Sequence, residues 1–111
     1  MRIYISIPIS GCNIEKQCAA ASEIADNLRK LGHEPVNPFD TPEAPPDMSD
    51  KEKYAYYMGE DIKRLLMCDA VFLCERWNES KGCLLEFHAT SIYGLEQYGR
   101  LEDIPKANGH E

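Results

Sequence analysis

A glutamate and the short polar segment before it have the clearest chemical potential in this sequence. Glu86 falls on one face of an expected helix, where small residues one turn earlier leave open space over its carboxylate. The segment Ser80-Lys81-Gly82 opens the same helix with a hydroxyl, a cation and free backbone N–H groups, which together can receive a phosphate or carboxylate. An anion site beside a carboxylate suggests a phosphorylated sugar. Two plainer interpretations compete: a solvated glutamate at Glu86 and a simple helix N-cap at Ser80.

A second carboxylate stands on the apolar face of another expected helix. Asp61 lies one turn from Tyr57 and one turn from Leu65, where a carboxylate is costly unless it is paired or lines a cleft. The alternative is a carboxylate bonded to a neighbouring arginine or backbone group at the edge of the core. Asp69, which ends the helix just before a strand, is better interpreted as a turn or cap residue.

The remaining motifs are weaker. The turn Pro8-Ile9-Ser10-Gly11 joins a strand to a helix, but it lacks the glycines of a dinucleotide fingerprint and the Gly-Lys-Ser/Thr of a P-loop. Four aromatic side chains could stack on a base, although aromatic residues at such positions more often belong to the core: Tyr4, Tyr56, Tyr57 and Trp77. The five cysteines are odd in number, never spaced as CxxC and mostly in apolar stretches, so we expect reduced thiols and no disulfide frame or zinc site.

The first half of the chain reads as strand, helix, strand and loop. Residues 2–7 alternate isoleucines with polar or aromatic residues, which predicts a strand. Apolar residues at helical spacing follow, with Asn13 as the N-cap and Gly32 at the end. Residues 33–37 contain Pro35 and therefore predict an edge strand. The proline-rich segment 37–50 predicts a long loop that resists both helix and sheet.

The second half repeats the alternation. Ser49 and Glu52 have the spacing of a capping box. The buried face of the helix that follows is expected at Tyr54, Tyr57, Met58, Ile62 and Leu65. Residues 70–74 form a continuous apolar run, as in a strand covered on both faces. A third helix is expected from about Ser80 to Gly94, and residues 95–104 predict one weak final strand.

This order of elements predicts the fold class. Alternating strands and helices with right-handed crossovers give a small α/β, doubly wound (Rossmann- or flavodoxin-like) parallel sheet of about four strands, with helices on both faces. Ligands bind such sheets outside the carboxyl ends of the strands. The segments expected there are residues 8–13, 38–50 and 75–82, which are also the least regular parts of the sequence.

Length and composition set further bounds. A chain of 111 residues with 43% hydrophobic residues fits one domain, expected at residues 1–104 with a flexible tail at 105–111. The formal charge of −7 would repel a phosphodiester backbone, so nucleic acid is not an expected partner. The N-terminus has no signal-peptide pattern and no apolar run reaches membrane-spanning length. We therefore expect a cytoplasmic protein without a membrane partner.

Three stretches together resemble the nucleoside 2-deoxyribosyltransferase superfamily over nearly the whole chain. They are Tyr4-Ile5-Ser6-Ile7-Pro8-Ile9-Ser10-Gly11, then Gly59-Glu60-Asp61 ahead of Cys68-Asp69-Ala70-Val71, and Trp77 with Ser80-Lys81-Gly82-Cys83-Leu84-Leu85-Glu86. The sequence is most similar to a compact branch of bacterial and phage proteins, and next to the 2′-deoxynucleoside 5′-phosphate N-hydrolases. The order and spacing of these stretches are more specific than any one of them.

The resemblance implies cleavage of the bond between a base and C1′ of a deoxyribose, in two displacements, with no cofactor and no metal. It implies that Glu86 attacks C1′, that Asp61 protonates the base or orients the nucleotide, and that Tyr4 positions the substrate. It also implies substrate contacts at Ser6, Pro8, Ile9, Ser10, Gly11, Trp77, Ser80, Lys81 and Gly82. Relatives build their sites at subunit contacts, so we expect a homodimer or a larger homo-oligomer.

Ser80 bears on the substrate. Transferases of free nucleosides that resemble this segment carry a carboxylate there, whereas the monophosphate hydrolases carry a serine, so a nucleoside 5′-monophosphate is favoured over a free nucleoside. The hydrolases also have an arginine where this chain has Ser10, and Pro8 removes a backbone N–H from the first loop. The sequence therefore leaves two main hypotheses: an N-glycosidase or deoxyribosyltransferase, and a non-catalytic nucleotide-binding or sensing module on the same fold. A third, a structural or interaction protein whose proline-rich loop docks a partner, has weaker support.

Overall fold

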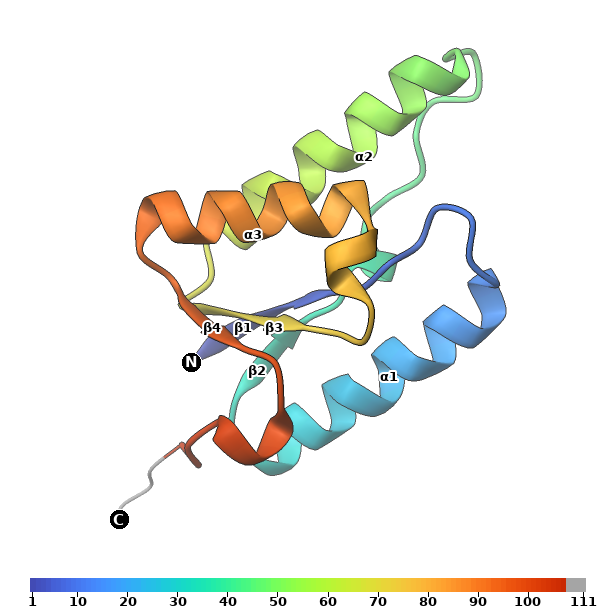
Figure 1. Ribbon diagram of the computed structural model, residues 1–111. Coiled ribbons are helices and arrows are strands. Elements are labelled where there is room, and N and C mark those ends of the chain that lie inside the picture. Colours follow the sequence, from blue (N-terminus) through green and yellow to red (C-terminus); the bar gives the residue numbers. More distant parts are fainter. Residues whose placement is uncertain (108–111) are drawn as a thin grey trace.

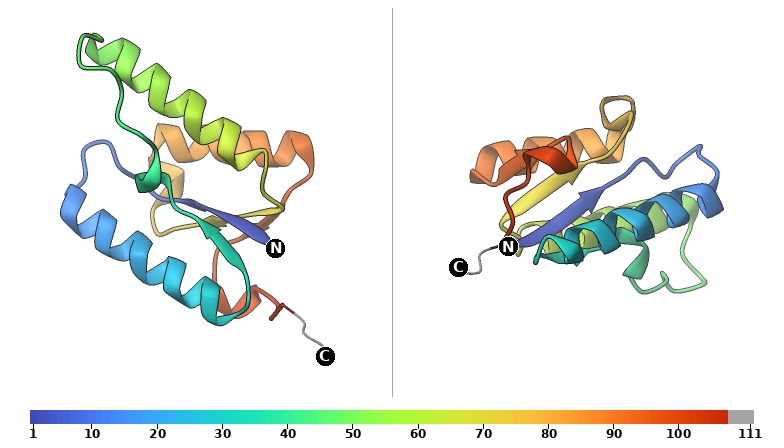
Figure 2. Two further views of the ribbon diagram at one scale, coloured as in Figure 1. Left: turned by 180° about the vertical axis from the view of Figure 1, so that it is seen from behind. Right: turned by 90° about the horizontal axis from the view of Figure 1, so that it is seen from below.

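A four-stranded, all-parallel sheet forms the centre of the protein, in a computed structural model that describes residues 1–107. The strands lie in the order β2-β1-β3-β4, with bounds β1 Arg2–Ser6, β2 Glu34–Val36, β3 Ala70–Leu73 and β4 Glu96–Tyr98. Helix α1 (Ile14–Lys30) covers one face, while α2 (Asp50–Leu65) and α3 (Lys81–Tyr93) cover the other (Figure 1, Figure 2). The predicted α/β doubly wound fold is confirmed.

The two-residue period of β1 divides the core into two clusters. Ile3 and Ile5 point toward α1 and pack with its Leu28. Tyr4 points to the opposite face and packs with Leu65 of α2, beneath α2 and α3. Ser6 has the same parity as Tyr4, so its hydroxyl also points to the face that α2 and α3 cover. The alternation within β1 therefore places the hydroxyl groups of Tyr4 and Ser6 on the same face of the sheet.

Helices α1 and α2 begin at the N-cap residues that the sequence predicts. The Asn13 side chain accepts from the Lys16 N–H at the start of α1, and Ser49 and Glu52 form a complete capping box at the start of α2. The strand β2 lies at the sheet edge, where Pro35 is tolerated.

Helix α2 and the loop before it correct two predictions. The first half of α2 extends beyond the sheet (Figure 1), and Tyr54 is 48% exposed, so its assignment to the buried face is wrong. The core cluster on this side draws on Ile62 and Leu65 from the second half of the helix. The proline-rich loop also contains a 3₁₀ turn at Pro38–Asp40, which the Asn37 side chain caps.

The C-terminal elements follow the predicted order. All four residues of β3 are buried, α3 ends at Gly94 in the left-handed conformation, and β4 is a short strand at the second edge. Pro105 and Ala107 still contact the body, through their bonds to His33 Nε2 (2.6 Å) and the Leu31 carbonyl (2.8 Å). The rest of the expected tail, 108–111, lies outside the described residues. Within residues 1–107, no helix is long and apolar enough to cross a membrane.

Candidate functional site

A cavity of about 420 Å³ opens at the carboxyl end of β1, beneath α2 and α3. Its floor includes Tyr4 and Ile7, and its walls come from the loops after β1 and β2, from α2 and from the start of α3. Both predicted carboxylates, Asp61 and Glu86, line it. This is the position at which a doubly wound sheet binds ligands, because the loops after β1 and β3 lead to helices on opposite faces.

Glu86 is held at this cavity by two hydroxyl groups from β1. Its side chain is only 5% exposed, so the interpretation as an ordinary solvated glutamate is wrong. The Tyr4 hydroxyl donates to Oε2 at 3.0 Å, and the Ser6 hydroxyl donates to Oε1 at 2.7 Å. Each carboxylate oxygen therefore has one donor and one remaining lone-pair direction, and the donors come from a buried strand that cannot easily move.

Burial dominates the electrostatics of Glu86. Desolvation raises its pKa from 4.5 to about 7; the hydrogen bond from Ser6 opposes this rise, the charge of Asp61 adds to it, and the hydrogen bond from Tyr4 opposes it. The pKa of Tyr4 is itself raised, first by burial and then by the charges of Glu86 and Asp61. Tyr4 therefore stays a hydrogen-bond donor across the working pH range. Glu86 exchanges its proton near neutrality, as groups used in acid, base or nucleophilic chemistry do.

Asp61 is the second buried carboxylate, at 8% exposed. The Thr41 hydroxyl bonds to Oδ1 at 3.2 Å, and Arg64 Nη1 donates to the Thr41 oxygen at 2.7 Å. Burial raises the pKa of Asp61 to about 6, against the lowering effects of Thr41, Arg64 and Tyr4. Asp61 is therefore paired at the edge of the core, but with a threonine hydroxyl and not with the arginine or backbone group that was expected, and the carboxylate lines the cavity as well.

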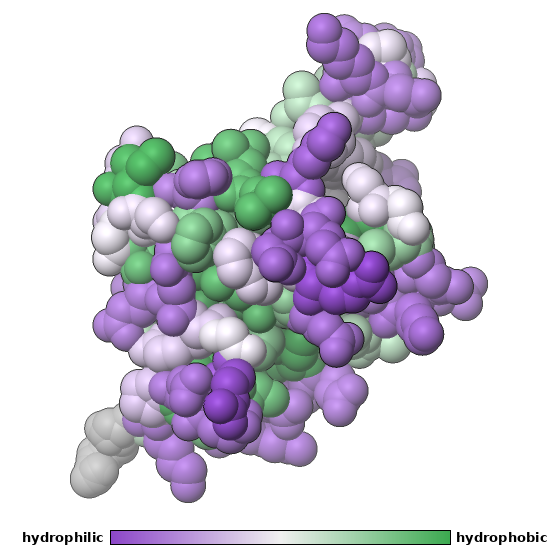
Figure 3. All heavy atoms as spheres, viewed as in Figure 1, coloured by the Kyte–Doolittle hydropathy of each residue, from purple (hydrophilic) through white to green (hydrophobic). Residues whose placement is uncertain are grey.

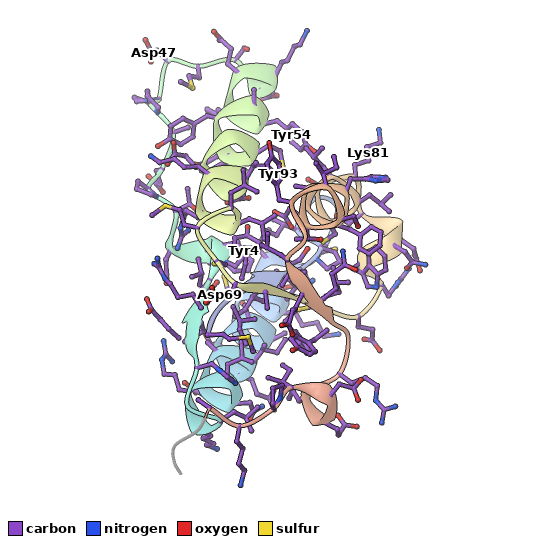
Figure 4. The ribbon with its side chains drawn as sticks, turned by 90° about the vertical axis from the view of Figure 1, so that its left-hand side faces the viewer. Tyr4, Asp47, Tyr54, Asp69, Lys81 and Tyr93 are labelled. Carbon is purple, nitrogen blue, oxygen red and sulfur yellow. The ribbon has the colours of Figure 1, made fainter. Side chains whose placement is uncertain are left out.

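The start of α3 forms the polar end of the cavity. Ser80 is the N-cap, and its hydroxyl accepts from the Cys83 N–H at 3.2 Å. Lys81 is exposed, and Gly82 leaves room for Met58 of α2, whose sulfur would lie 3.4 Å from an added Cβ. Figure 4 shows Lys81 on α3 and Tyr54 on α2 toward the same end of the molecule, with Tyr4 beneath them.

The structure brings most of the predicted site residues to one cavity, but not all. Besides the two carboxylates and Tyr4, the cavity is lined by Ile9, Ser10, Ser80, Lys81 and Gly82. Ser6 contacts Glu86 from behind the cavity wall. Trp77 lines neither of the two larger cavities, because its ring packs on Phe87 with centroids 4.8 Å apart. The structure thus places Trp77 in the core cluster under α3, away from the predicted base contact.

A second cavity of about 620 Å³ adjoins the first on the α1 side of the first loop. Pro8 and Gly11 line this second cavity, together with Lys16 and Arg76. The two cavities share four lining residues: Ile7, Ser10, Glu79 and Ser80. The loop Pro8-Ile9-Ser10-Gly11 therefore contributes to both.

Three functional neighbours were not expected from the sequence. Thr41 contacts Asp61 from the loop 38–50, which was expected near the strand ends, but no motif in that loop singles out this residue. Tyr54 and Met58 line the cavity, although their helical spacing with Ile62 and Leu65 assigned them to the core. The length of α2 could have predicted their exposure to the cavity, because a helix of this length extends past such short strands.

Comparisons with known proteins agree with this fold. A solved structure of a 2-deoxyribosyltransferase from the psychrotolerant bacterium Bacillus psychrosaccharolyticus is similar, with a TM-score of 0.64 and 23% sequence identity. The likeness covers 87% of this chain and 69% of that one. A family model described as a domain of unknown function (DUF4406) matches residues 1–97. The curated proteins include no match.

Proposed function

This chain belongs to the DUF4406 family, and we propose that it cleaves or transfers at the N-glycosidic bond of a (deoxy)nucleoside 5′-monophosphate. The observation that carries the proposal is the environment of Glu86, a buried carboxylate at a cavity with one hydroxyl donor on each oxygen. The fold shared with a 2-deoxyribosyltransferase supports a nucleoside as the ligand class.

In the proposed reaction Glu86 attacks C1′ of the sugar. The C1′–N bond breaks, its electron pair leaves with the base, and a glycosyl ester forms on Glu86. Water then hydrolyses this ester, or a second base takes the sugar and restores the carboxylate. Tyr4 and Ser6 support both steps, because their hydrogen bonds hold the carboxylate in one orientation as its charge disappears and returns.

Asp61 is proposed as the group that protonates the leaving base or orients the nucleotide. It lines the same cavity as Glu86, and its pKa of about 6 lets it hold a proton for part of the time near neutrality. Because the two buried carboxylates interact, the pair is best described as sharing protons. The productive form has its one proton on Asp61 and a charged Glu86.

The start of α3 is proposed to bind the 5′-phosphate. Ser80, Lys81 and the first N–H groups of α3 lie at the polar end of the cavity, and Lys81 makes no ion pair among residues 1–107. The serine at 80 supports the relation to the 2′-deoxynucleoside 5′-phosphate N-hydrolases. Ser10 stands where those hydrolases have an arginine, so this chain would bind the phosphate chiefly from α3.

We also propose that the protein is a homodimer or a larger homo-oligomer, through the outer face of α3. Figure 3 shows hydrophobic side chains gathered over this helix, where Leu85, Ile92 and Tyr93 are 49%, 76% and 66% exposed. From Gly82 to Tyr93 the helix has no charged side chain except the buried Glu86. Two chains of formal charge −7 repel each other over most of their surface, so an uncharged face is where a second copy can pack.

A second candidate function is a non-catalytic nucleotide-binding or sensing module. The first loop favours it, because Pro8 offers no N–H and Ser10 provides no charge toward a phosphate. Such a module would keep the cavity and bind a nucleotide without releasing its base.

Release of free base separates the two candidates. Wild type and Glu86→Ala are incubated with a panel of nucleosides, nucleoside monophosphates and deoxynucleoside monophosphates, and free base is measured by chromatography. The proposal expects release by wild type from at least one monophosphate and none by the variant, although the variant still binds it. Binding by wild type without release from any member would favour the sensing module.

A further inference from the structure

Asp61 is connected to the proline-rich loop by a hydroxyl that bonds to two side chains. Arg64 Nη1 donates to Thr41 Oγ1 at 2.7 Å, and the same oxygen lies 3.2 Å from Asp61 Oδ1. A guanidinium group has donors and no acceptor, so the Thr41 proton is not used by Arg64. The Thr41 hydroxyl donates it to Asp61 Oδ1. Arg64 forms no ion pair with Asp61 within 4 Å among residues 1–107, so its closest connection to the carboxylate passes through Thr41.

The backbone at Thr41 is fixed as firmly as its hydroxyl. The Thr41 N–H donates to the Pro38 carbonyl at 3.2 Å and closes the 3₁₀ turn, and Pro38 itself is buried and lines the cavity. Three residues later, the Ala44 N–H donates to the Tyr57 hydroxyl of α2 at 2.9 Å. The loop is thus tied to α2 at two points, on either side of the segment 42–43.

We propose that Thr41 and Arg64 are positioning residues for Asp61, which hold Oδ1 in place and leave Oδ2 for the ligand. Neither residue touches the reacting atoms, so both act through Asp61. The inference rests on the proposed function, because it gives Asp61 work to do on a bound nucleotide. It adds a role to a loop that the sequence treats as irregular, and it explains why a loop threonine and a helix arginine are brought together.

The electrostatics around Asp61 agree with this arrangement. The groups that face it are Tyr4 on β1, Glu86 on α3, and Glu60 and Arg64 on α2, with Thr41 on the loop. Burial raises the pKa of Asp61, and the Thr41 hydrogen bond is the largest opposing influence, ahead of the Arg64 charge. Loss of the Thr41 hydroxyl should therefore raise the pKa of Asp61 above about 6.

The test measures the pKa of Asp61 and the rate of base release in the same variants. The Asp61 carboxyl is titrated by NMR on ¹³C-labelled protein for wild type, Thr41→Val, Thr41→Ser and Thr90→Val. Thr90 is the matched control, a buried threonine whose hydroxyl bonds within α3 to the Phe87 carbonyl. The pKa should rise in Thr41→Val, return in Thr41→Ser and stay unchanged in Thr90→Val.

The expected change in kcat is opposite in direction to the change that a pKa shift alone would cause. A higher pKa alone leaves more Asp61 protonated at pH 7, which would raise the rate. Lost orientation instead lowers kcat of Thr41→Val by roughly tenfold with KM nearly unchanged, a size typical of one hydrogen bond. An unchanged or higher kcat would overturn the positioning role.

Arg64 is tested through a double-mutant cycle on kcat, because loss of its charge raises the Asp61 pKa whether or not Thr41 is present. If Arg64 holds Asp61 through Thr41, Arg64→Met should lower kcat only slightly further once Thr41 is valine. Fully additive losses of kcat would overturn the relay. The NMR readout needs no catalysis, so a raised pKa in a protein that releases no base would contradict the proposed function and leave the relay intact. An unshifted Asp61 pKa in a Thr41→Val enzyme that still releases base would contradict the relay and leave the proposed function intact.

Discussion

Glu86 occupies a position that costs folding free energy. Two hydroxyl donors offset only part of the desolvation, which is why the pKa stays raised at about 7. A solvated glutamate would be fully ionised at neutral pH. Folding free energy spent on one side chain in a cavity is typical of a functional site.

This cost gives stability a defined pH dependence. The unfolded chain releases the Glu86 proton near pH 4.5 and the folded chain only near 7, so the free energy of unfolding falls as pH rises through this window. Glu86→Gln cannot ionise and should be more stable than wild type at pH 8, by roughly 3 kcal/mol, with little difference at pH 4.5. Thermal unfolding at both values measures this. The exposed Glu23→Gln is the control, and equal stabilities of Glu86→Gln and wild type at pH 8 would refute the burial cost.

Ser6 should control the height of the pH–rate profile. The carboxylate pair predicts a bell-shaped kcat/KM with limbs near 6 and 7, because the productive form holds a single proton. Ser6→Ala raises the pKa of Glu86, so that proton moves from Asp61 toward Glu86. We expect a bell about tenfold lower, with its descending limb at higher pH. Base-release rates across pH test this against Ser91→Ala, an exposed serine of α3, and an unmoved profile in Ser6→Ala would contradict it.

At the residue scale the sequence names the candidate side chains better than the residues that support them. Glu86, Asp61 and Tyr4 could be named because their types and spacing matched a family pattern, and the cavity contains all three. Thr41 and the stacking of Trp77 on Phe87 could not be predicted, because both depend on how segments far apart in the chain pack together.

The start of α3 combines a structural role with a proposed binding role, and one substitution separates them. Aspartate caps a helix about as well as serine but repels a phosphate. Ser80→Asp should therefore keep the protein's stability while raising KM for the monophosphate at least tenfold more than KM for the free nucleoside.

Steady-state kinetics with both substrates measure this ratio. Ser49→Asp makes the same cap substitution on α2, away from the polar end of the cavity, and should leave the ratio unchanged. An unchanged ratio in Ser80→Asp would mean that Ser80 is only an N-cap.

Helices and strands were predictable where local rules decide them. The caps at Asn13, Ser49, Ser80 and Gly94 all lie where their residue types indicate. The exposure of Tyr54 could not be read from helical spacing, because it depends on where the sheet beneath α2 ends. The same limit applies to the 3₁₀ turn at Pro38–Asp40, which a proline-rich composition does not reveal.

The whole molecule explains why these side chains meet. In the order β2-β1-β3-β4 the chain leaves β1 and β3 toward opposite faces, which opens a crevice at their carboxyl ends. Alternating strands and helices with right-handed crossovers predict a parallel, doubly wound sheet, whereas the strand order itself comes from the structure. The size and lining of the cavities depend on side-chain packing, and they needed the structure.

The apolar face of α3 predicts association in solution. Light scattering coupled to size exclusion should give at least twice the chain mass of 12.6 kDa at micromolar concentration. Ile92→Glu should shift the protein toward monomer, because it places like charges on both sides of the contact. Ala19→Glu on the exposed side of α1 is the control. A wild-type monomer at tens of micromolar would contradict the interface.

The most direct test of the account is to trap the sugar on Glu86. The substrate identified by base release is prepared with fluorine at C2′, which slows hydrolysis of the glycosyl ester, and the protein is digested and analysed by mass spectrometry. A sugar phosphate adduct is expected on the peptide that contains Glu86, and no adduct in Glu86→Gln. Base release that continues in Glu86→Gln, or an adduct on a different residue, would contradict the proposed role of Glu86 as the nucleophile.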